Sequence, residues 1–260
     1  MNLQRFKIDP LPLGCASLST LMKAFDTVEK RDVCLEVVSL DHYEDYQEYF
    51  DNEVAILKKL KHQNVIGFYG SFSTNERFYI ALEFVKGGDL ESYLRNVMPP
   101  LPEATVLSFF SQMISFLKYL HQLKVIHRDL KPGNILLAEG NIVKISGFTF
   151  SKLFETDDFV ATSKVGTPSY LPPEIIKEEP YSFPVDVWCL GCIIYECMTG
   201  KPPFYHQNIA QLEKLITTTD PNPIGGNYSP VLKETVMKML EKDPNKRISI
   251  EQIQKSLSFL

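Results

Sequence analysis

The chain has 260 residues, of which 44% are hydrophobic and 23% are charged, and its formal net charge at pH 7 is −5. This length and apolar content are enough for a sizeable buried core. The negative charge argues against a nucleic-acid-binding protein, because such proteins usually carry a basic face. No apolar run approaches the ~18 residues that a membrane-spanning helix needs, so we expect no membrane span.

Five cysteines are present, which is an odd number. Cys189 and Cys192 form a CxxC pair, but no second CxxC and no close histidine pair accompanies it, and a structural zinc site needs four such ligands. We therefore predict buried thiols on an apolar helix and no metal. Free thiols, and a start (residues 1–10) without the apolar core of a secretory signal, predict a reducing compartment, either cytoplasmic or nuclear.

The first part of the chain is predicted to be rich in strands. Phe50, Val54, Leu57 and Leu60 fall on one face of a helix predicted over residues 44–61. Runs of β-branched and aromatic residues predict strands at residues 5–8, 18–25, 32–40, 65–72 and 77–85.

After Gly87 and Gly88 the pattern becomes helical. We therefore expect a single domain over residues 1–260 of the α+β class, with a β-rich N-terminal lobe at about 1–83, a hinge at 84–87 and a mainly helical C-terminal lobe at 88–260. The helical segments are residues 90–97, 104–123, 185–200, 209–217, 229–242 and 247–260.

Residues 125–137, VIHRDLKPGNILL, carry the most specific motif of the chain. They match the catalytic-loop signature H-R-D-L-x-x-x-N of protein kinases at each fixed position. Three later segments follow in the family's order, namely GTPSYLPPE (166–174), DVWCLGCIIYECMTGKPPF (186–204) and DPNKR (243–247). The chain therefore resembles the eukaryotic protein kinase superfamily and its bilobal fold. Lys131, taken together with Thr167 of the segment GTPSYLPPE, places the resemblance on the serine/threonine branch.

The resemblance implies roles for individual residues. Asp129 corresponds to the catalytic base, Lys131 to the lysine beside the transferred phosphate and Asn134 to a metal ligand. Glu174 and Arg247 correspond to an ion pair of the C-terminal lobe. The implied nucleotide site consists of Gly14 in the glycine-rich loop, Leu21, Cys34 and Leu136 around the adenine, Glu83 and Val85 in the hinge, Glu36 and Gly147 at the phosphate end, and Glu53 on the helix that the family calls αC.

Three parts of this nucleotide site depart from the family's pattern. In the glycine-rich loop, Ala16 and Ser19 occupy two glycine positions, which hinders a close approach of the backbone to phosphate. The strand motif V-A-I-K reads Val-Cys-Leu-Glu, so that Glu36 stands where a lysine binds the phosphates. The motif D-F-G reads Gly-Phe-Thr, so that Gly147 stands where an aspartate binds Mg²⁺.

The glutamate at position 36 creates an electrostatic problem. If Glu36 and Glu53 lie ~4 Å apart, their charges repel each other by roughly 4 kcal/mol at an effective dielectric constant of 20. Three solutions stay open: Glu36 is protonated, it finds another cation, or the helix that bears Glu53 swings outward. We do not expect Lys23 to be the missing cation, because its strand position does not aim it at the phosphates.

These departures predict a pseudokinase that acts as a protein-binding scaffold or an allosteric regulator in signalling. Losing one preorganised electrostatic group commonly costs ~10²–10³ in rate, and here one such group is absent and a second is inverted in sign. We accordingly expect no cofactor, doubt that ATP and Mg²⁺ bind, and expect a protein partner such as an active kinase or its substrate.

Two alternatives remain beside the pseudokinase. One is an active or residually active ATP-dependent serine/threonine kinase with unusual nucleotide coordination, which the complete HRDLKPGN segment favours. The other is a competitor that holds a kinase's substrate without modifying it. Three hydroxyls of the expected activation loop are candidate phosphorylation sites, because a phosphate there could pair with Arg128; they belong to Thr156, Thr162 and Ser163.

Overall fold

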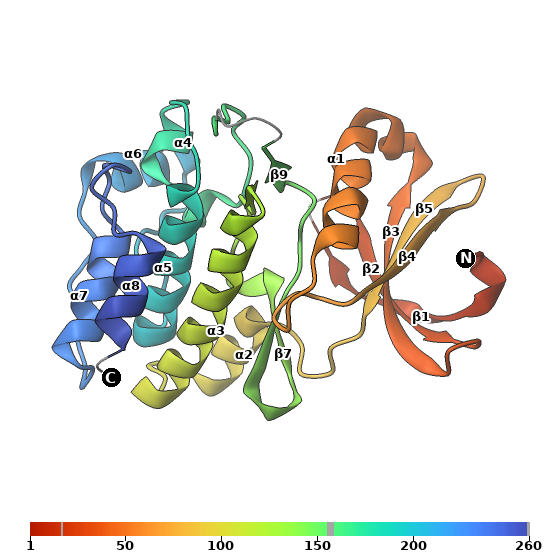
Figure 1. Cartoon of the computed structure of the whole chain (residues 1–260), viewed down its shortest axis with the longest axis horizontal. Coiled ribbons are helices and arrows are strands. Elements are labelled where there is room, and N and C mark those ends of the chain that lie inside the picture. Colours follow the sequence, from red (N-terminus) through yellow and green to blue (C-terminus); the bar gives the residue numbers. More distant parts are fainter. Residues whose placement is uncertain (17, 155–158, 259–260) are drawn as a thin grey trace.

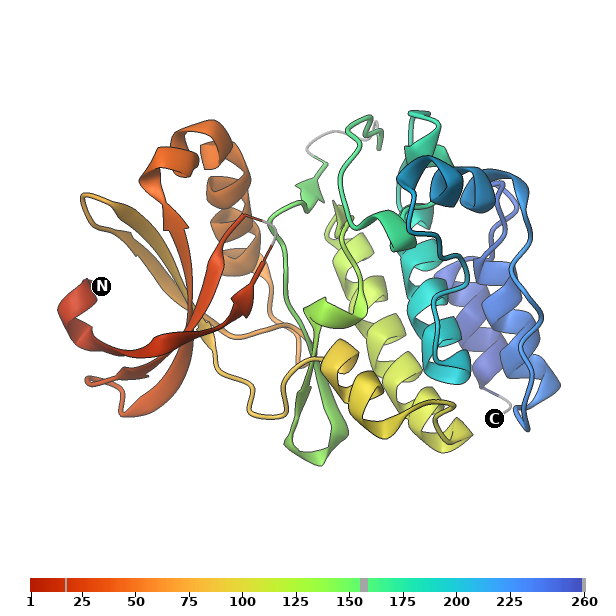
Figure 2. The same ribbon diagram turned by 180° about the vertical axis from the view of Figure 1, so that it is seen from behind.

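The computed structural model describes residues 1–16, 18–154 and 159–258. Figure 1 shows a β-sheet with one helix at one end of the molecule and a group of helices at the other, and Figure 2 shows the same division from behind. The bilobal α+β fold that the sequence predicts is therefore confirmed. Among the described residues, no helix is both long and apolar enough to cross a membrane.

The smaller lobe is built on an antiparallel sheet with the strand order β1-β2-β3-β5-β4. β1 lies at the edge, and its register against β2 shifts between Ile8 and Pro12, because proline has no N–H to donate to the ladder. The strands are β1 (Phe6–Cys15), β2 (Thr20–Asp26), β3 (Arg31–Ser39), β4 (Phe68–Ser73) and β5 (Arg77–Glu83).

Strand β3 decides which of its side chains reach the space between the lobes. Val33, Leu35 and Val37 lie in a small apolar cluster on one face of the sheet. Because side chains alternate along a strand, Cys34 and Glu36 lie on the other face, where both line the interlobe cleft. The pleat of β3 thus carries the unusual glutamate into the cleft.

Helix α1 (Leu40–Lys59) packs against β3, β4 and β5. Its predicted apolar face is confirmed, since Phe50, Val54 and Leu57 are buried. The helix begins at Leu40, earlier than the predicted start at residue 44, because it follows directly on β3.

The strand predicted over 65–72 begins later than expected, at Phe68. Val65 instead forms a parallel bridge with Ile145, and the Ile66 amide donates to the Ile145 carbonyl at 2.9 Å. The Gly67 carbonyl accepts the Glu83 amide of β5 at 2.7 Å. The contacts of Val65 and Ile66 therefore tie the two lobes together, whereas Gly67 stays bonded to β5.

The larger lobe is helical, with four short strands that support the residues facing the cleft. β7 and β8 form an antiparallel hairpin, and β6 pairs with β9. Short 3-10 turns of this lobe lie at Pro132–Asn134, Glu139–Asn141 and Pro168–Tyr170, and a further one at Leu3–Arg5 precedes β1 in the smaller lobe. The remaining elements are α2 (Leu90–Val97), α3 (Glu103–Gln122), β6 (Val125–Ile126), β7 (Ile135–Ala138), β8 (Ile142–Ile145), β9 (Lys152–Leu153), α4 (Pro173–Ile176), α5 (Pro184–Thr199), α6 (Ile209–Thr218), α7 (Pro230–Met239) and α8 (Ile250–Leu257).

Helix α5 is the central helix of this lobe and is buried along nearly its whole length. It packs against α3 and α7, and Trp188 stacks on Phe204 with ring centroids 6.0 Å apart. The helix ends at Gly200, whose φ of +82° suits a left-handed C-cap. Cys189 and Cys192 lie in this buried helix as free thiols.

Candidate active site

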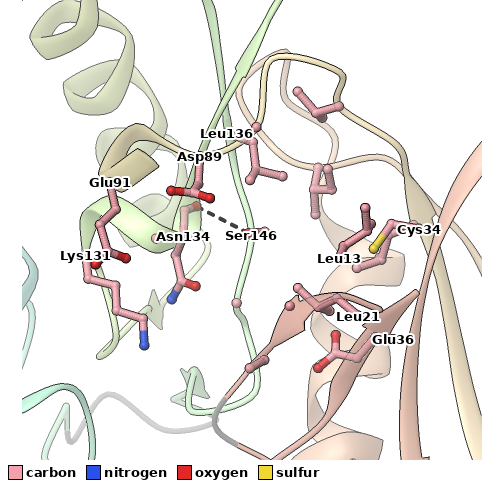
Figure 3. Close-up of a pocket in the computed structure, with 18 of the residues that line it drawn as sticks. Leu13, Leu21, Cys34, Glu36, Asp89, Glu91, Lys131, Asn134, Leu136 and Ser146 are labelled. Atoms are coloured by element: carbon pink, nitrogen blue, oxygen red, sulfur yellow. Dashed lines mark hydrogen bonds between the residues drawn. The ribbon is translucent and has the colours of Figure 1, made fainter. Parts of the chain in front are cut away.

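A cleft of about 580 Å³ lies between the lobes. Figure 3 shows side chains from both lobes around it, with Leu21, Cys34 and Glu36 on one side and Lys131 and Asn134 on the other. Apart from Glu53, which lies buried behind the cleft, the structure brings every predicted site residue to its lining. These lining residues are Gly14, Leu21, Cys34, Glu36, Glu83, Val85, Asp129, Lys131, Asn134, Leu136 and Gly147.

The end of the cleft nearest the hinge is apolar, which suits a flat heterocyclic base. Sequence reasoning missed three contributors there, Leu13, Ile66 and Leu82. Leu13 and Leu82 are the sequence neighbours of Gly14 and Glu83, which were predicted as site residues. The hinge residue Glu83 is held in place, since it accepts the Gly67 amide at 3.0 Å and pairs with Lys144 at 3.2 Å.

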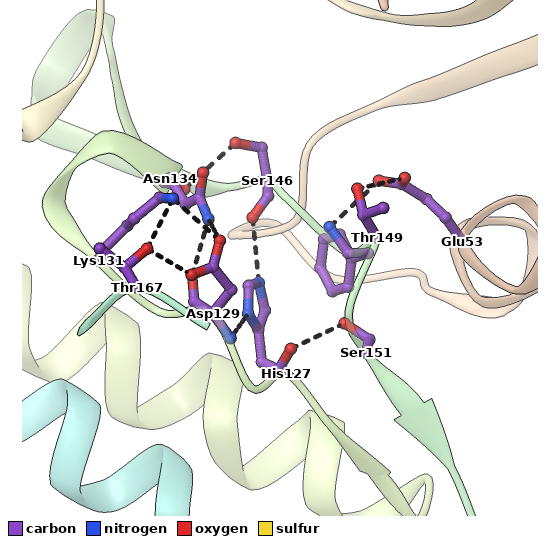
Figure 4. Close-up of polar contacts among 10 residues, drawn as sticks. Glu53, His127, Asp129, Lys131, Asn134, Ser146, Thr149, Ser151 and Thr167 are labelled. Atoms are coloured by element: carbon purple, nitrogen blue, oxygen red, sulfur yellow. Dashed lines mark hydrogen bonds and ion pairs between the residues drawn. The ribbon is translucent and has the colours of Figure 1, made fainter. Parts of the chain in front are cut away.

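The catalytic-loop residues form a closed hydrogen-bond network (Figure 4). The Thr167 hydroxyl donates to Oδ1 of Asp129 at 2.8 Å and accepts from Nζ of Lys131 at 2.9 Å. Lys131 Nζ also lies 3.1 Å from Oδ2 of Asp129. Asn134 Nδ2 donates to the Asp129 carbonyl at 2.7 Å and to its Oδ2 at 3.1 Å. The arrangement fixes Asp129 with its carboxylate at the cleft.

Asp186, at the start of α5, anchors the backbone of the catalytic loop. It accepts the amides of His127 and Arg128 at 2.9 and 3.0 Å, and Nε2 of His121 lies 2.9 Å from its Oδ2. Burial by itself would raise the pKa of Asp186, but the His121 hydrogen bond and the neighbouring histidines outweigh it, so that its pKa lies below the usual value. The aspartate is therefore an ionised anchor for the backbone that precedes Asp129.

We expect Asp186→Asn to lower the free energy of unfolding at pH 7 by about 1–3 kcal/mol, because the amide nitrogen of asparagine would face a donor. A group with a lowered folded pKa stabilises above its unfolded pKa, and that contribution is lost as the pH falls through the folded pKa. The difference between wild type and variant should therefore shrink below about pH 4. Urea unfolding measures it, with the exposed Asp220→Asn as control. An unchanged midpoint at pH 7 would contradict the anchoring role.

Arg128 links the catalytic loop to the segment that follows β8. Its Nε donates to the Phe150 carbonyl at 2.5 Å, and its Nη1 donates to the Ser163 hydroxyl at 2.8 Å. The unmodified Ser163 hydroxyl thus contacts Arg128, and phosphorylation of Ser163 stays a prediction. Thr162 is exposed, and Thr156 lies outside the described residues.

Glu36 and Glu53 are both buried, with side chains that interact electrostatically; the residues are 5% and 1% exposed. Glu36 accepts the Ser19 hydroxyl at 2.5 Å. Burial raises the pKa of Glu36, although the Ser19 hydrogen bond opposes this, and burial together with the charge of Glu36 raises the pKa of Glu53 well above its usual range. The raised pKa values favour a proton on one of these two carboxyls, and the α1 helix lies inward with Glu53 buried. Lys23 is turned away, 3.3 Å from Asp32.

Gly147 faces Asn134 across the cleft floor. A Cβ at this position, whose φ is +78°, would lie 2.5 Å from Nδ2 of Asn134, so a side chain would displace the asparagine. The neighbouring Phe148 is fully buried, and its ring lies 4.9 Å from His127 and 6.2 Å from Phe116. The phenylalanine of this motif therefore keeps its buried packing. Asn134 occupies the space that an aspartate side chain at position 147 would need.

A β-sheet lobe and a helical lobe that enclose a cleft over an H-R-D loop define the bilobal protein kinase fold. The chain belongs to the protein kinase domain family, whose model matches residues 11–259. Its relatives place it on the serine/threonine branch. It is 38% identical over 197 residues to serine/threonine-protein kinase 36 of Pongo abelii, and 38% identical over 197 residues to serine/threonine-protein kinase TIO of Arabidopsis thaliana. It is 36% identical over 205 residues to serine/threonine-protein kinase Nek5 of Homo sapiens.

These matches cover 76% to 78% of this chain but only 15% to 29% of the relatives. The chain thus corresponds to less than a third of the length of these three relatives.

The family membership corrects one expectation. The expectation that no cofactor binds is wrong, because the family and these relatives are serine/threonine protein kinases, which use ATP and Mg²⁺. The residues present fit these groups in part. The apolar end of the cleft suits the base, and the Asp129 carboxylate and the Asn134 amide offer the oxygen ligands that Mg²⁺ prefers. The substitutions at positions 36 and 147 left these features in place, and for that reason they do not by themselves remove the site.

Proposed function

We propose that this chain is a pseudokinase domain, which binds a protein partner as scaffold or allosteric regulator and transfers phosphate poorly. The observation that carries the proposal is Glu36, whose buried carboxyl lines the cleft on β3 beside Glu53. In the family a lysine stands there and attracts the phosphates. A carboxyl group offers no such attraction, whether or not it is ionised.

Gly147 supports the same proposal from the other lobe. It brings no oxygen ligand to the floor of the cleft, and Asn134 fills the space beside it. Two groups that act on the phosphates are therefore altered at once, while the frame around them is intact. A protein with this combination keeps the surfaces by which kinases meet other proteins and loses rate in the chemical step.

An active or residually active serine/threonine kinase is the second candidate. The network of Asp129, Lys131 and Thr167 favours it, because the carboxylate is in place to accept a hydroxyl proton. The names of the relatives favour it as well.

Phosphoryl transfer to a generic basic protein substrate separates the two candidates. We expect the wild-type chain with ATP and Mg²⁺ or Mn²⁺ to form no more product than its Asp129→Asn variant. A thermal-shift titration under the same conditions should show that ATP stabilises the folded chain, since a ligand that binds only the folded state raises the midpoint. Product that depends on Asp129 would overturn the pseudokinase proposal and establish the second candidate.

The partner is proposed to be an active kinase or its substrate. Mixing the full chain with an active serine/threonine kinase and that kinase's substrate tests both possibilities. Allosteric regulation predicts a changed rate at saturating substrate, whereas substrate competition predicts inhibition that saturating substrate relieves.

A further inference from the structure

Helix α1 is attached to the segment that follows β8 along one of its faces. The Asn52 side chain donates to the Ser151 carbonyl at 2.6 Å, and the Tyr49 ring meets the Phe150 ring edge-on with centroids 5.7 Å apart. Glu53 receives two further hydrogen bonds from the same segment. Its Oε1 accepts the Phe148 amide at 3.2 Å, and its Oε2 accepts the hydroxyl of Thr149 at 2.7 Å (Figure 4).

The opposite side of Glu53 gives no attraction. The side chain that β3 presents there is Glu36, whose own partner is the Ser19 hydroxyl, and a carboxyl group offers Glu53 no cation. Lys23 of the neighbouring strand pairs with Asp32 instead. On this side the sheet therefore offers no cation to the glutamate of α1, yet α1 lies inward and Glu53 is buried.

We propose that Thr149 is the positioning residue that holds α1 inward, its hydroxyl doing for Glu53 what the ammonium group of a strand lysine does elsewhere in the family. A glycine at position 149, as in the motif D-F-G, has no group that could donate this bond. The glutamate at position 36 and the threonine at position 149 are thus a compensating pair. The contact that fixes α1 has moved from the sheet to the C-terminal lobe.

The consequence is that the contact holding Glu53 needs no cation from β3. An active kinase needs its lysine–glutamate ion pair in place, whereas here a neutral hydroxyl and one backbone amide hold the glutamate. The inference concerns the position of α1 only. It stands whether or not the chain transfers phosphate, so its test is independent of the activity assay.

Thr149→Val and Thr149→Ser form a matched pair of variants. Valine keeps the shape of threonine without the hydroxyl, and serine keeps the hydroxyl without the methyl group. We expect amide hydrogen exchange in residues 48–58 of α1 to become roughly tenfold faster in Thr149→Val, since a buried acceptor loses its donor. Exchange in Thr149→Ser should stay close to wild type, and the amides of α5 should be unaffected in both.

A double variant tests the compensation directly. In Glu36→Lys the strand again offers a cation to Glu53, so adding Thr149→Val should change α1 exchange by less than about twofold. The proposal is overturned if Thr149→Val exchanges like wild type, if Thr149→Ser exchanges as fast as Thr149→Val, or if Glu36→Lys fails to suppress the effect of valine.

Discussion

Restoring both altered phosphate-end groups, in the variant Glu36→Lys/Gly147→Asp, should raise phosphoryl transfer by at least ~10²-fold over the wild-type chain. Removing one preorganised electrostatic group from an active site typically costs ~10²–10³ in rate, and the double variant returns two. The rest of the machinery is in position, because Asp129 is held by Thr167 and Lys131 at 2.8 and 3.1 Å. A lysine at position 36 would also find its partner, since Glu53 lies buried next to it.

The new aspartate requires one local change. Its Cβ would lie 2.5 Å from Nδ2 of Asn134, so the asparagine must rotate away. The positive φ of +78° at position 147 adds backbone strain, which aspartate tolerates better than most residues do.

Three control variants accompany the double variant. Each single variant should gain less than the pair does, because groups that act on the same phosphates are not additive. Adding Asp129→Asn to the double variant should abolish the gain, which assigns it to this cleft and not to a contaminating kinase. If the folded double variant transfers no more phosphate than wild type, the loss of activity lies elsewhere, with Ala16 and Ser19 of the glycine-rich loop as the next candidates.

The second large effect is expected at the ion pair between Arg247 and Glu174. The two side chains are almost fully buried and joined by two hydrogen bonds, with Nη1 2.6 Å from Oε1 and Nη2 2.9 Å from Oε2. Arg247 also donates to the carbonyls of Pro184 and Glu241, both at 2.9 Å. It therefore fastens α4, the start of α5 and the loop after α7 to one another.

Arg247→Met should lower the free energy of unfolding by ~3–5 kcal/mol, because it leaves the Glu174 carboxylate buried without a cation. Urea denaturation monitored by the single tryptophan, Trp188, measures this loss. Arg247 lies over the same indole at 5.1 Å, so circular dichroism should be recorded in parallel.

Lys238→Met provides the matched control. Lys238 pairs with Glu234 at 2.8 Å, but both side chains are more than half exposed, and pairs of that kind contribute ~0–1 kcal/mol. Replacing both buried partners, in Glu174→Leu/Arg247→Met, should recover much of the lost free energy of unfolding. Apolar residues of similar volume can often replace a buried ion pair with little loss of stability. A loss below 1 kcal/mol in Arg247→Met alone would show that the pair does not hold this lobe together.

The fold and the larger part of the site were predictable because the signals are local. The H-R-D motif, the helical periods after Gly88 and the strand-forming residues of 32–40 all depend on neighbours in the chain, and the structure places these elements close to where the sequence predicts them. The boundaries were less accurate. The strand expected from Val65 begins at Phe68, because the amide of Ile66 bonds to the other lobe, and such a partner is invisible in a local pattern.

The chemical identity of each motif position was determined by the sequence alone. Glu36 in place of a lysine and Gly147 in place of an aspartate can be read from spacing within a few residues of recognisable motifs. What only the tertiary structure decided is how the molecule accommodates them. Glu53 and Thr149 are 96 residues apart in the chain, and no propensity or period connects them. The contact between that hydroxyl and Glu53, the burial of two carboxyls and the pleat that turns Glu36 toward the cleft are all properties of packing.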